Sequence, residues 1–320
     1  MKIVRRAVHG VLLLDKPLGL SSNQALQQAK RLYRAEKAGH TGTLDPLASG
    51  LLPLCFGAAT KFAQVSLDAD KAYRATLVLG QRTSTGDGEG ALVEERPVNV
   101  DRAAIEAACA RFTGSLLQLP PMHSALKHEG RALYEYAREG VEIEREPRQV
   151  QIHGLDIVDW HDAVLVIDVR CSKGTYIRTL AEDIGAALGC GAHLGALRRT
   201  ASGPLTLERA VTLEQLSALD EAGRDALLLP PDLMLARLPA VALADDEAGR
   251  FLTGLRRRVM LPDAPSVRVY GPAPGAFLGS AHICAGELIA DRLLSPVEVR
   301  GLLAASPASR PDPAVTESQE

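Results

Sequence analysis

Residues 39–52, GHTGTLDPLASGLL, constrain the fold more than any other segment, because three glycines and a proline surround one carboxylate, Asp45. Glycine is entropically costly in a helix, and proline lacks the N–H donor and clashes with the preceding turn. We therefore predict that this segment is a tight loop that holds Asp45 at a fixed angle. The local pattern also allows a second interpretation, in which Asp45 only caps a turn through its own backbone.

The composition indicates a globular protein of two domains. The chain has 320 residues, of which 46% are hydrophobic and 23% are charged. Its five cysteines are scattered without a C-x-x-C pair, which argues against a zinc ribbon and a disulfide framework and favours a reducing compartment. The apolar run at residues 11–14 is too short for a secretion signal or a membrane span. We expect a cytoplasmic protein.

The net charge of −3 lacks the basic excess that is typical of many nucleic-acid-binding proteins. Positive charge is nevertheless concentrated at two places. Residues 1–50 hold eight Lys/Arg against three Asp/Glu, and residues 251–300 hold six against four, including the run Arg256-Arg257-Arg258. Because phosphate contacts need only a local positive surface, this distribution permits RNA binding without requiring it. Solvated basic faces are the alternative.

Strands and helices are mixed along the chain without regular alternation, which favours an α+β sheet over a doubly wound fold. Residues 83–90 are predicted to be a flexible loop, and residues 118–127 an extended segment that contains two prolines. Apolar periodicity and capping residues predict strands at 11–14, 73–79, 150–158, 163–170 and 194–199, and helices at 21–33, 60–67, 101–112, 132–139, 176–188 and 245–252.

Four further motifs accompany the Asp45 segment in a fixed order. They are residues 10–23 (GVLLLDKPLGLSSN), 71–74 (KAYR), 124–138 (SALKHEGRALYEYAR) and 171–180 (CSKGTYIRTL). With residues 39–52 they resemble the motifs of the TruB family of tRNA pseudouridine synthases of the bacterial type, collinear over roughly residues 8–235. The resemblance implies the pseudouridine synthase fold, which is a long mixed β-sheet with a central cleft across it.

The resemblance also implies the domain organisation. Residues 1–235 would form the catalytic domain, with an RNA-binding insertion at about 118–145. After Pro230, Pro231 and Pro239 the sequence pattern changes, and it predicts short strands that proline and glycine separate. Residues 236–305 are then implied to be a small β-rich, PUA-like RNA-binding domain. The last residues, 306–320, are rich in Pro, Ser, Asp and Glu, and we expect them to be disordered.

The reaction that the resemblance implies needs few groups. Converting uridine to pseudouridine breaks the C1′–N1 bond, turns the uracil over and joins C5 to C1′, so we expect neither a redox cofactor nor a metal. Asp45 is the implied nucleophile, at C6 or at C1′. Arg178 is the cation that would keep it ionised, through a fork of two hydrogen bonds. Tyr73 is the implied platform for the flipped base and could also move a proton.

The resemblance implies further contacts with substrate. His40 would occupy the space that the flipped nucleotide leaves, Tyr176 could pack beneath the base, and Leu197 would line the pocket. Lys16, in a stiff turn before Pro17, would brace the cleft or meet a phosphate. Lys71 and Arg74, which flank Tyr73, could also contact phosphates.

The insertion interleaves basic and aromatic residues, a pattern that suits recognition of a folded RNA loop. A solvated helix with i,i+4 charge pairs is the alternative, which Glu135 and Glu139 support. His123 stands where the family commonly has a tyrosine. The interleaved basic and aromatic residues of the insertion are Lys127, His128, Arg131, Tyr134, Tyr136 and Arg138.

These observations predict an isomerase that acts on the uridine at tRNA position 55. Its partner would be the T-arm stem-loop, and it would work as a monomer without a membrane or an obligatory protein partner. One alternative is a guide-RNA-dependent synthase, against which the RNA-reading insertion argues. A second alternative is a non-catalytic tRNA-binding or tRNA-folding protein, against which the presence of Asp45, Tyr73 and Arg178 argues.

Overall fold

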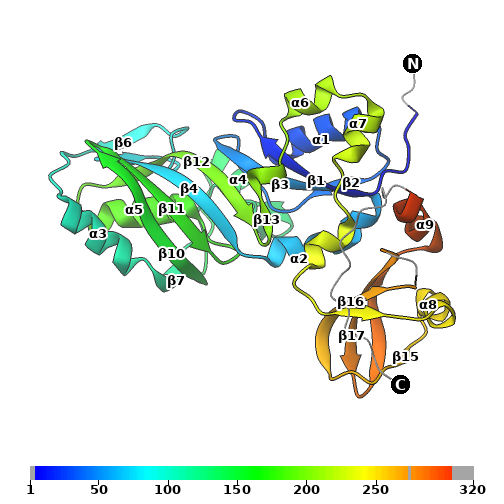
Figure 1. Cartoon of the computed structure of the whole chain (residues 1–320). Helices are drawn as coiled ribbons and strands as arrows, with labels where there is room; N and C mark the ends of the chain where they lie inside the picture. Colours follow the sequence, from blue (N-terminus) through cyan, green and yellow to red (C-terminus); the bar gives the residue numbers. More distant parts are fainter. Residues whose placement is uncertain (1–3, 273–274, 305–320) are drawn as a thin grey trace.

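A nine-stranded mixed sheet runs through the body of the molecule in the computed structural model, which describes residues 4–272 and 275–304 (Figure 1). Its strands are β1 (Gly10–Lys16), β2 (Ala38–His40), β3 (Ala48–Phe56), β4 (Lys71–Leu79), β7 (Gly114–Gln118), β10 (Arg148–His161), β11 (Val164–Cys171), β12 (Ala192–Ser202) and β13 (Leu205–Thr206). They follow the order β1-β3-β12-β4-β11-β10-β7, with β2 beside β3 and β13 beside β12. β12 runs parallel to β3 and antiparallel to β4.

Helices cover both ends of this sheet, and others lie on the insertion and in the C-terminal part of the chain. They are α1 (Ser22–Leu32), η1 (Gly57–Phe62), α2 (Ala63–Asp68), α3 (Arg102–Arg111), α4 (Leu133–Arg138), α5 (Ile177–Ala187), η2 (Leu207–Arg209), α6 (Leu213–Ala218), α7 (Glu221–Ala226), η3 (Pro231–Leu235), α8 (Asp245–Leu252) and α9 (Pro296–Ala304). Helix α1 begins with the predicted serine cap, because Ser21 and Gln24 form a reciprocal capping box. The mixed α+β class predicted from the sequence is confirmed.

The strand β1 is buried on both faces, which explains its continuous apolar run. Val11 and Leu13 belong to a core that reaches the C-terminal unit, whereas Leu12 and Leu14 pack in the core that includes α1. At the other end of the sheet, α3 and α5 pack on β4, β10, β11 and β12. Each fully buried aliphatic side chain contributes roughly 1.5–3 kcal/mol, so burial on both faces holds the central strands firmly.

A second, five-stranded sheet forms the C-terminal unit in the order β14-β16-β17-β18-β15. Its core is continuous with the body, because the rings of Phe62 and Phe277 lie 5.1 Å apart and both side chains are buried. The predicted β-rich C-terminal unit is confirmed, while the boundary at residue 235 stays a prediction. Residues 306–320 lie outside the described residues. The strands are β14 (Ala240–Ala242), β15 (Arg257–Arg258), β16 (Ala264–Tyr270), β17 (Phe277–Cys284) and β18 (Glu287–Leu293).

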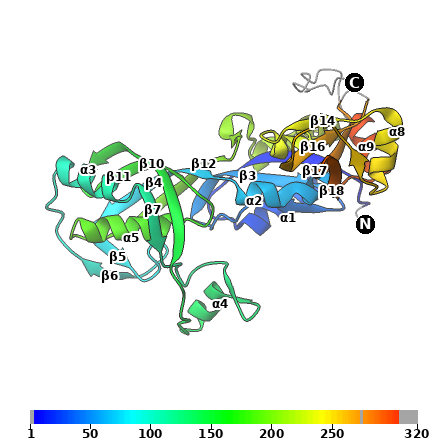
Figure 2. The same cartoon turned by 90° about the horizontal axis from the view of Figure 1, so that it is seen from below.

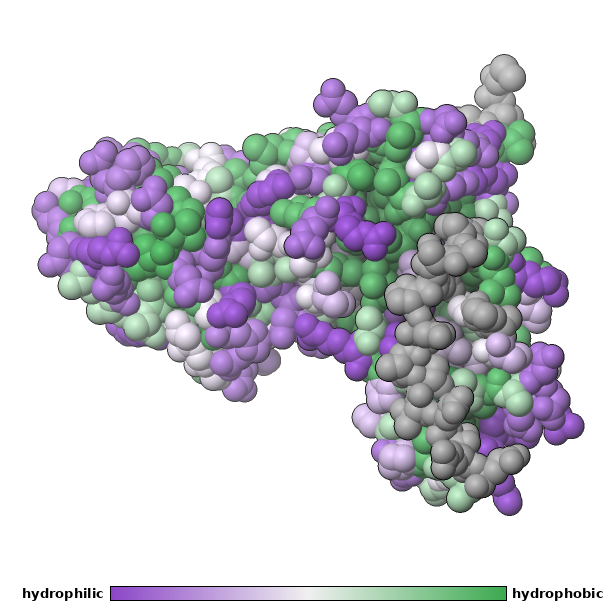
Figure 3. Space-filling model, viewed as in Figure 1, coloured by the Kyte–Doolittle hydropathy of each residue, from purple (hydrophilic) through white to green (hydrophobic). Residues whose placement is uncertain are grey.

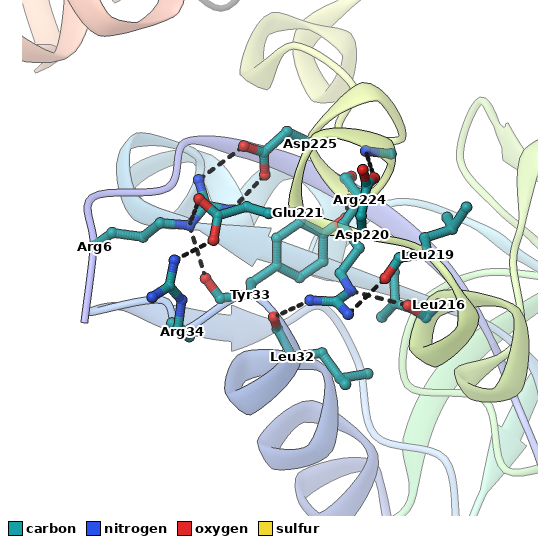
Figure 4. Close-up of polar contacts among 11 residues, drawn as sticks. Arg6, Leu32, Tyr33, Arg34, Leu216, Leu219, Asp220, Glu221, Arg224 and Asp225 are labelled. Carbon is teal, nitrogen blue, oxygen red and sulfur yellow. Dashed lines mark hydrogen bonds and ion pairs between the residues drawn. The ribbon is translucent and has the colours of Figure 1, made fainter. Parts of the chain in front are cut away.

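Helices α6 and α7 are fastened to the end of α1 by a polar network (Figure 4). Arg6 pairs with Asp225, and its Nη1 lies 2.8 Å from the carboxylate. The Tyr33 hydroxyl donates to the Arg224 carbonyl at 2.6 Å, and the Arg224 guanidinium donates to the Leu32 carbonyl at 2.8 Å. The segment before β1 and the segment after β13 are thereby joined around one buried tyrosine.

The insertion projects from the body beyond the end of β7, and α4 lies on this projection (Figure 2). It contains the short hairpin of β8 (Lys127–His128) and β9 (Arg131–Ala132), followed by α4. The two-stranded sheet of β5 (Gln81–Thr83) and β6 (Leu92–Glu95) lies at the same end of the body as α3 (Figure 2). The face in Figure 3 interleaves polar and apolar residues, with apolar surface where the C-terminal unit meets the body. No helix within residues 4–272 and 275–304 is long and apolar enough to cross a bilayer.

The loop predicted around Asp45 is shorter than expected. Residues 39–52 are not one loop, because β2 ends at His40 and β3 begins at Ala48, so the loop spans residues 41–47. The apolar run of β3 prevails over its glycine: Gly50 lies inside the strand with φ +98°, where a Cβ would approach the Arg199 carbonyl oxygen to 2.3 Å. Residues 84–90 form the predicted loop between β5 and β6, and Asp87 within it is 3% exposed and hydrogen-bonded.

We expect Phe277→Ala to destabilise the body as well as the C-terminal unit, because its ring belongs to their shared core. The free energy of unfolding should fall by about 3–5 kcal/mol. The single tryptophan, Trp160, lies far away in β10, so its fluorescence during urea unfolding reports on the body. An unchanged midpoint at Trp160 would contradict a shared core.

Candidate active site

Asp45 lies in the loop between β2 and β3, and hydrogen bonds hold this loop on both sides. The buried Ser22 hydroxyl accepts from the Leu44 N–H at 2.7 Å and lies 2.9 Å from the Leu44 carbonyl, to which it can donate. The Gly19 N–H donates to the Pro46 carbonyl at 2.9 Å. The backbone is therefore fixed, whereas the Asp45 side chain is 53% exposed and faces outward.

Arg178 lies in the first turn of α5, and its Nη2 donates to Asp45 Oδ2 at 2.6 Å. The structure thus brings together two residues that are 133 positions apart in the sequence. The Arg178 side chain is only 9% exposed, so a buried guanidinium supports an accessible carboxylate. The predicted fork of two hydrogen bonds is wrong, since one bond joins this pair.

Asp87 takes the other edge of the guanidinium, and sequence reasoning missed it. Its Oδ2 lies 2.9 Å from Arg178 Nε, and its side chain is 4% exposed. The Thr85 hydroxyl donates to Asp87 Oδ1, and the Glu89 N–H donates to the same atom at 3.1 Å. The available signal was an acidic residue between two glycines, which is typical of a tight turn.

The remaining nitrogen of Arg178, Nη1, donates to two backbone carbonyls. They belong to His123 at 3.3 Å and to Thr85 at 3.4 Å. Each nitrogen of the guanidinium is therefore engaged by an ion pair or a hydrogen bond, which offsets the cost of burying its charge. The arrangement fixes Arg178 with respect to the loop of Asp87 and the beginning of the insertion.

Tyr73 lies in β4 opposite Arg199 of β12, and its hydroxyl forms a hydrogen bond with the Arg199 guanidinium. Burial raises the pKa of the Tyr73 phenol, so the hydroxyl stays protonated at neutral pH. Arg199, which sequence reasoning also missed, is 1% exposed. It donates to the Leu51 carbonyl at 2.7 Å and to the Gly42 carbonyl at 3.2 Å. It thus joins Tyr73, β3 and the loop of Asp45.

Lys16 acts as a brace in this structure. Its side chain is fully buried, and its Nζ donates to the carbonyls of Pro17 at 2.8 Å and Leu20 at 2.6 Å. Burial lowers the pKa of this amine to about 8. Of its two expected roles, the phosphate contact is wrong, because the ammonium has no access to solvent.

The residues beside Tyr73 are also engaged within the protein. Lys71 is buried and donates to the carbonyls of Ser66, Leu67 and Ala69, so the expected phosphate contact is wrong for it. Arg74 is exposed and pairs with Asp168.

The resemblance also placed His40, Tyr176 and Leu197 in the pocket. His40 ends β2, and its buried Nδ1 has no hydrogen-bond partner among the described residues. Burial lowers the pKa of this imidazole. Tyr176 caps α5, and burial raises the pKa of its phenol. Leu197 of β12 pairs with Ala48 of β3 and Ala75 of β4.

The insertion contains both patterns that the sequence suggested. Lys127 is exposed in β8. Arg131 pairs with Glu135 and Glu139, as the solvated-helix alternative expects, and also stacks 4.5 Å from the centre of the Tyr136 ring. Neither basic residue is joined to Asp45 in the described structure, whereas His123 reaches the site through its carbonyl.

The basic run in the C-terminal unit is largely neutralised. Arg256 pairs with Glu287 at 3.0 Å, and Arg257 pairs with Glu247. Two surface hollows, of about 430 and 420 Å³, lie at Arg258–Glu287 and at Lys61–Arg292, away from Asp45. The cleft predicted at the centre of the large sheet stays a prediction.

Comparison with known proteins places this site in a family. The model of the TruB family pseudouridylate synthase N-terminal domain matches residues 30–177, and that of the tRNA pseudouridylate synthase B C-terminal domain matches residues 178–236. The tRNA pseudouridine synthase B of Verminephrobacter eiseniae is 59% identical over 96% of this chain and 95% of its own length. That of Cupriavidus pinatubonensis is 58% identical over 92% and 96%.

Solved structures are similar in fold. A crystal structure of a Cbf5-Nop10-Gar1 complex contains a chain with a TM-score of 0.71 and 25% identity, over 91% of this chain and 87% of that one. An archaeal Nop10-Cbf5 complex gives a TM-score of 0.68 at 24% identity, over 90% of this chain and 86% of that one.

A mixed sheet of this topology, with an aspartate held by a buried arginine where β3 meets β12, defines a pseudouridine synthase. Such an enzyme isomerises uridine to pseudouridine. The chain belongs to the TruB family of these synthases, and the resemblance seen in its sequence is confirmed.

We expect Asp87→Asn to slow pseudouridine formation at least tenfold, because the neutral amide no longer balances the buried guanidinium. Charge-assisted hydrogen bonds contribute about 1.5–3 kcal/mol, so unfolding by urea should also require less denaturant. Single-turnover rates on a uridine-containing RNA measure the effect. The exposed neighbour Glu89→Gln is the control, and an equal loss in both variants would contradict a specific role for Asp87.

We expect His40 to make stability fall on the acid side of neutrality. Burial lowers its pKa in the folded state, so below the ordinary value of about 6.5 the unfolded chain binds a proton that the folded chain does not. Stability then decreases as pH falls, by at most about 1.4 kcal/mol per pH unit for one group. Urea unfolding measures this effect. Between pH 7.5 and 5.5 the free energy of unfolding of His40→Gln should decline less than that of wild type. The free energy of unfolding of the control, His161→Gln at an exposed position, should decline as much as that of wild type.

Proposed function

We propose that the chain converts the uridine at position 55 in the T-arm loop of tRNA to pseudouridine, as a stand-alone cytoplasmic monomer. The observation that carries this proposal is the Asp45–Arg178–Asp87 arrangement, in a chain that is 57–59% identical to proteins named tRNA pseudouridine synthase B over nearly their full length. At that identity the whole site, and not only the fold, is expected to be shared.

The accessible carboxylate of Asp45 is the nucleophile in this proposal, and it attacks C6 of the ring or C1′ of the sugar. The C1′–N1 bond breaks, the uracil turns over, and C5 joins C1′. The bond from Asp45 to the substrate then breaks, C5 releases its proton to solvent, and N1 takes up one proton, so atoms balance without a co-reactant. Arg178 holds the carboxylate aimed outward, because its own position is fixed by Asp87 and two carbonyls.

The uridine must leave its stack before Asp45 can reach it, at a cost of roughly a few kcal/mol. Tyr73 offers an aromatic face beside the Asp45 loop, and Leu197 lies two residues before Arg199 on the adjacent strand. His40 would then fill the gap that the nucleotide leaves, and Tyr176 would support the base. The protonated Tyr73 hydroxyl could relay the C5 proton only by accepting it while donating its own.

Recognition of the T-arm would fall to the projecting insertion. Lys127 is exposed there, and the Arg131–Tyr136 and Arg138–Tyr134 pairs present stacked cationic and aromatic surfaces. Phosphates would compete with Glu135 and Glu139 for Arg131, so RNA binding by this element should weaken as salt rises.

A guide-RNA-dependent activity is the second candidate, because the similar solved structure is a complex of Cbf5 with Nop10 and Gar1. The higher identity to proteins named tRNA pseudouridine synthase B favours the stand-alone reading. The stand-alone and the guide-dependent activities predict different results when the purified chain is given substrate RNA without a guide or another protein.

We expect the purified chain to form pseudouridine in a T-arm hairpin without added protein or guide, and Asp45→Asn to bind the hairpin but form none. Release of tritium from [5-³H]uridine measures turnover, and filter binding measures affinity. Appreciable turnover by Asp45→Asn would exclude Asp45 as nucleophile. A wild-type chain that binds the hairpin without turnover would instead favour the guide-dependent or the non-catalytic alternative.

A further inference from the structure

Gln118 joins two parts of the molecule that sequence reasoning treated separately. It is the last residue of β7 and the first residue of the insertion, and its side chain is 2% exposed. Its Oε1 accepts from the Tyr176 N–H at 3.0 Å, and its Nε2 donates to the Tyr176 carbonyl at 3.3 Å. One side-chain amide therefore pairs with both polar atoms of one backbone residue.

Tyr176 is the N-cap residue of α5, directly before the first helical residue Ile177, and Arg178 follows two positions later. The first N–H groups of a helix lack partners within the helix and need acceptors from elsewhere. A serine or aspartate usually provides one from the capping position itself, which a tyrosine ring cannot do. Here Gln118 holds the N-cap residue from 58 positions away, so it sets where the first turn of α5 lies.

The insertion makes a second connection to the same turn. The His123 carbonyl accepts from Arg178 Nη1 at 3.3 Å, and the neighbouring Ser124 carbonyl accepts from the Tyr134 N–H of α4 at 3.1 Å. Arg145, on the returning limb of the insertion, donates to the Pro120 carbonyl on the outgoing limb at 3.1 Å. A displacement of α4 or of either limb therefore acts on the segment that contacts Arg178.

We propose that Gln118 is a positioning residue, which couples the RNA-binding insertion to Arg178 through the N-terminus of α5. The inference rests on the proposed function of Arg178 and of the insertion. When RNA binds the insertion, Gln118 holds the N-terminus of α5 and the His123 carbonyl holds the guanidinium. Together they keep Arg178 in the orientation that supports Asp45. Without the Gln118 amide the insertion still offers its binding surface, but Arg178 is less well placed.

The test replaces Gln118 by methionine, which has nearly the same volume but forms no comparable hydrogen bonds. We expect the single-turnover rate on a T-arm hairpin to fall about tenfold or more, since small misplacements of a site are costly, while Kd changes less than about twofold. Gln149→Met is the matched control, because this exposed glutamine lies on the neighbouring strand and bonds only the Ser115 hydroxyl among the described residues. The single-turnover rate and the Kd of Gln149→Met should both stay within about twofold of wild type.

A double variant separates positioning from general loosening. Gln118→Met and Asp87→Asn act through the same guanidinium, so their effects on rate should be clearly less than multiplicative. Multiplicative effects, an unchanged rate, or a loss of affinity that parallels the loss of rate would each overturn the inference. If Gln118→Met does not fold, Gln118→Glu, which keeps the acceptor and loses the donor, takes its place with the same criteria.

Wild-type turnover on the hairpin is measured first. Its absence would overturn the proposed function, whereas normal wild-type turnover together with a fully active Gln118→Met variant would overturn this inference alone.

Discussion

The position of one buried guanidinium decides what the rest of the site can do. Arg178 lies between two carboxylates of unequal exposure, with Asp87 almost fully buried and Asp45 half open to solvent. Burying an unpaired charge costs several kcal/mol, and Asp87 with two backbone carbonyls offsets that cost. The remaining nitrogen can then serve Asp45 through a single bond. Arg178 therefore binds one oxygen of Asp45, and the Asp45 side chain stays half open to solvent.

The large sheet brings the other parts of the site together where β12 lies between β3 and β4. Arg199 links the Asp45 loop, β3 and Tyr73, while Lys16 braces the neighbouring turn through carbonyl groups. Such buried cations are held by backbone oxygens, and their places depend on strand register. A shift of one residue in β12 would turn Arg199 to the opposite face of the sheet.

Much of the fold and part of the site could be predicted from the sequence. The central strands, α1, α5 and α8 follow from apolar periodicity and caps, and Asp45, Tyr73 and Arg178 stand in distinctive segments. Asp87, Arg199 and Gln118 could not be found in this way, because each lies in an ordinary loop or strand and acts only through a partner distant in sequence. The Asp45 loop was predicted too long for a related reason: β3 tolerates Gly50 because the Arg199 backbone crosses there.

The sequence by itself determined the family, the mixed α+β elements and the identity of the central carboxylate, since these depend on local patterns and on the order of motifs. Only the tertiary structure decided which partner each charged group takes. It gave Arg178 two acids instead of one, enclosed Lys16 and Lys71 in carbonyl groups, and connected the insertion to α5 through Gln118. The physical reason is that a charge pairs with whatever the folded chain places within about 3 Å, and that distance bears no relation to separation along the sequence.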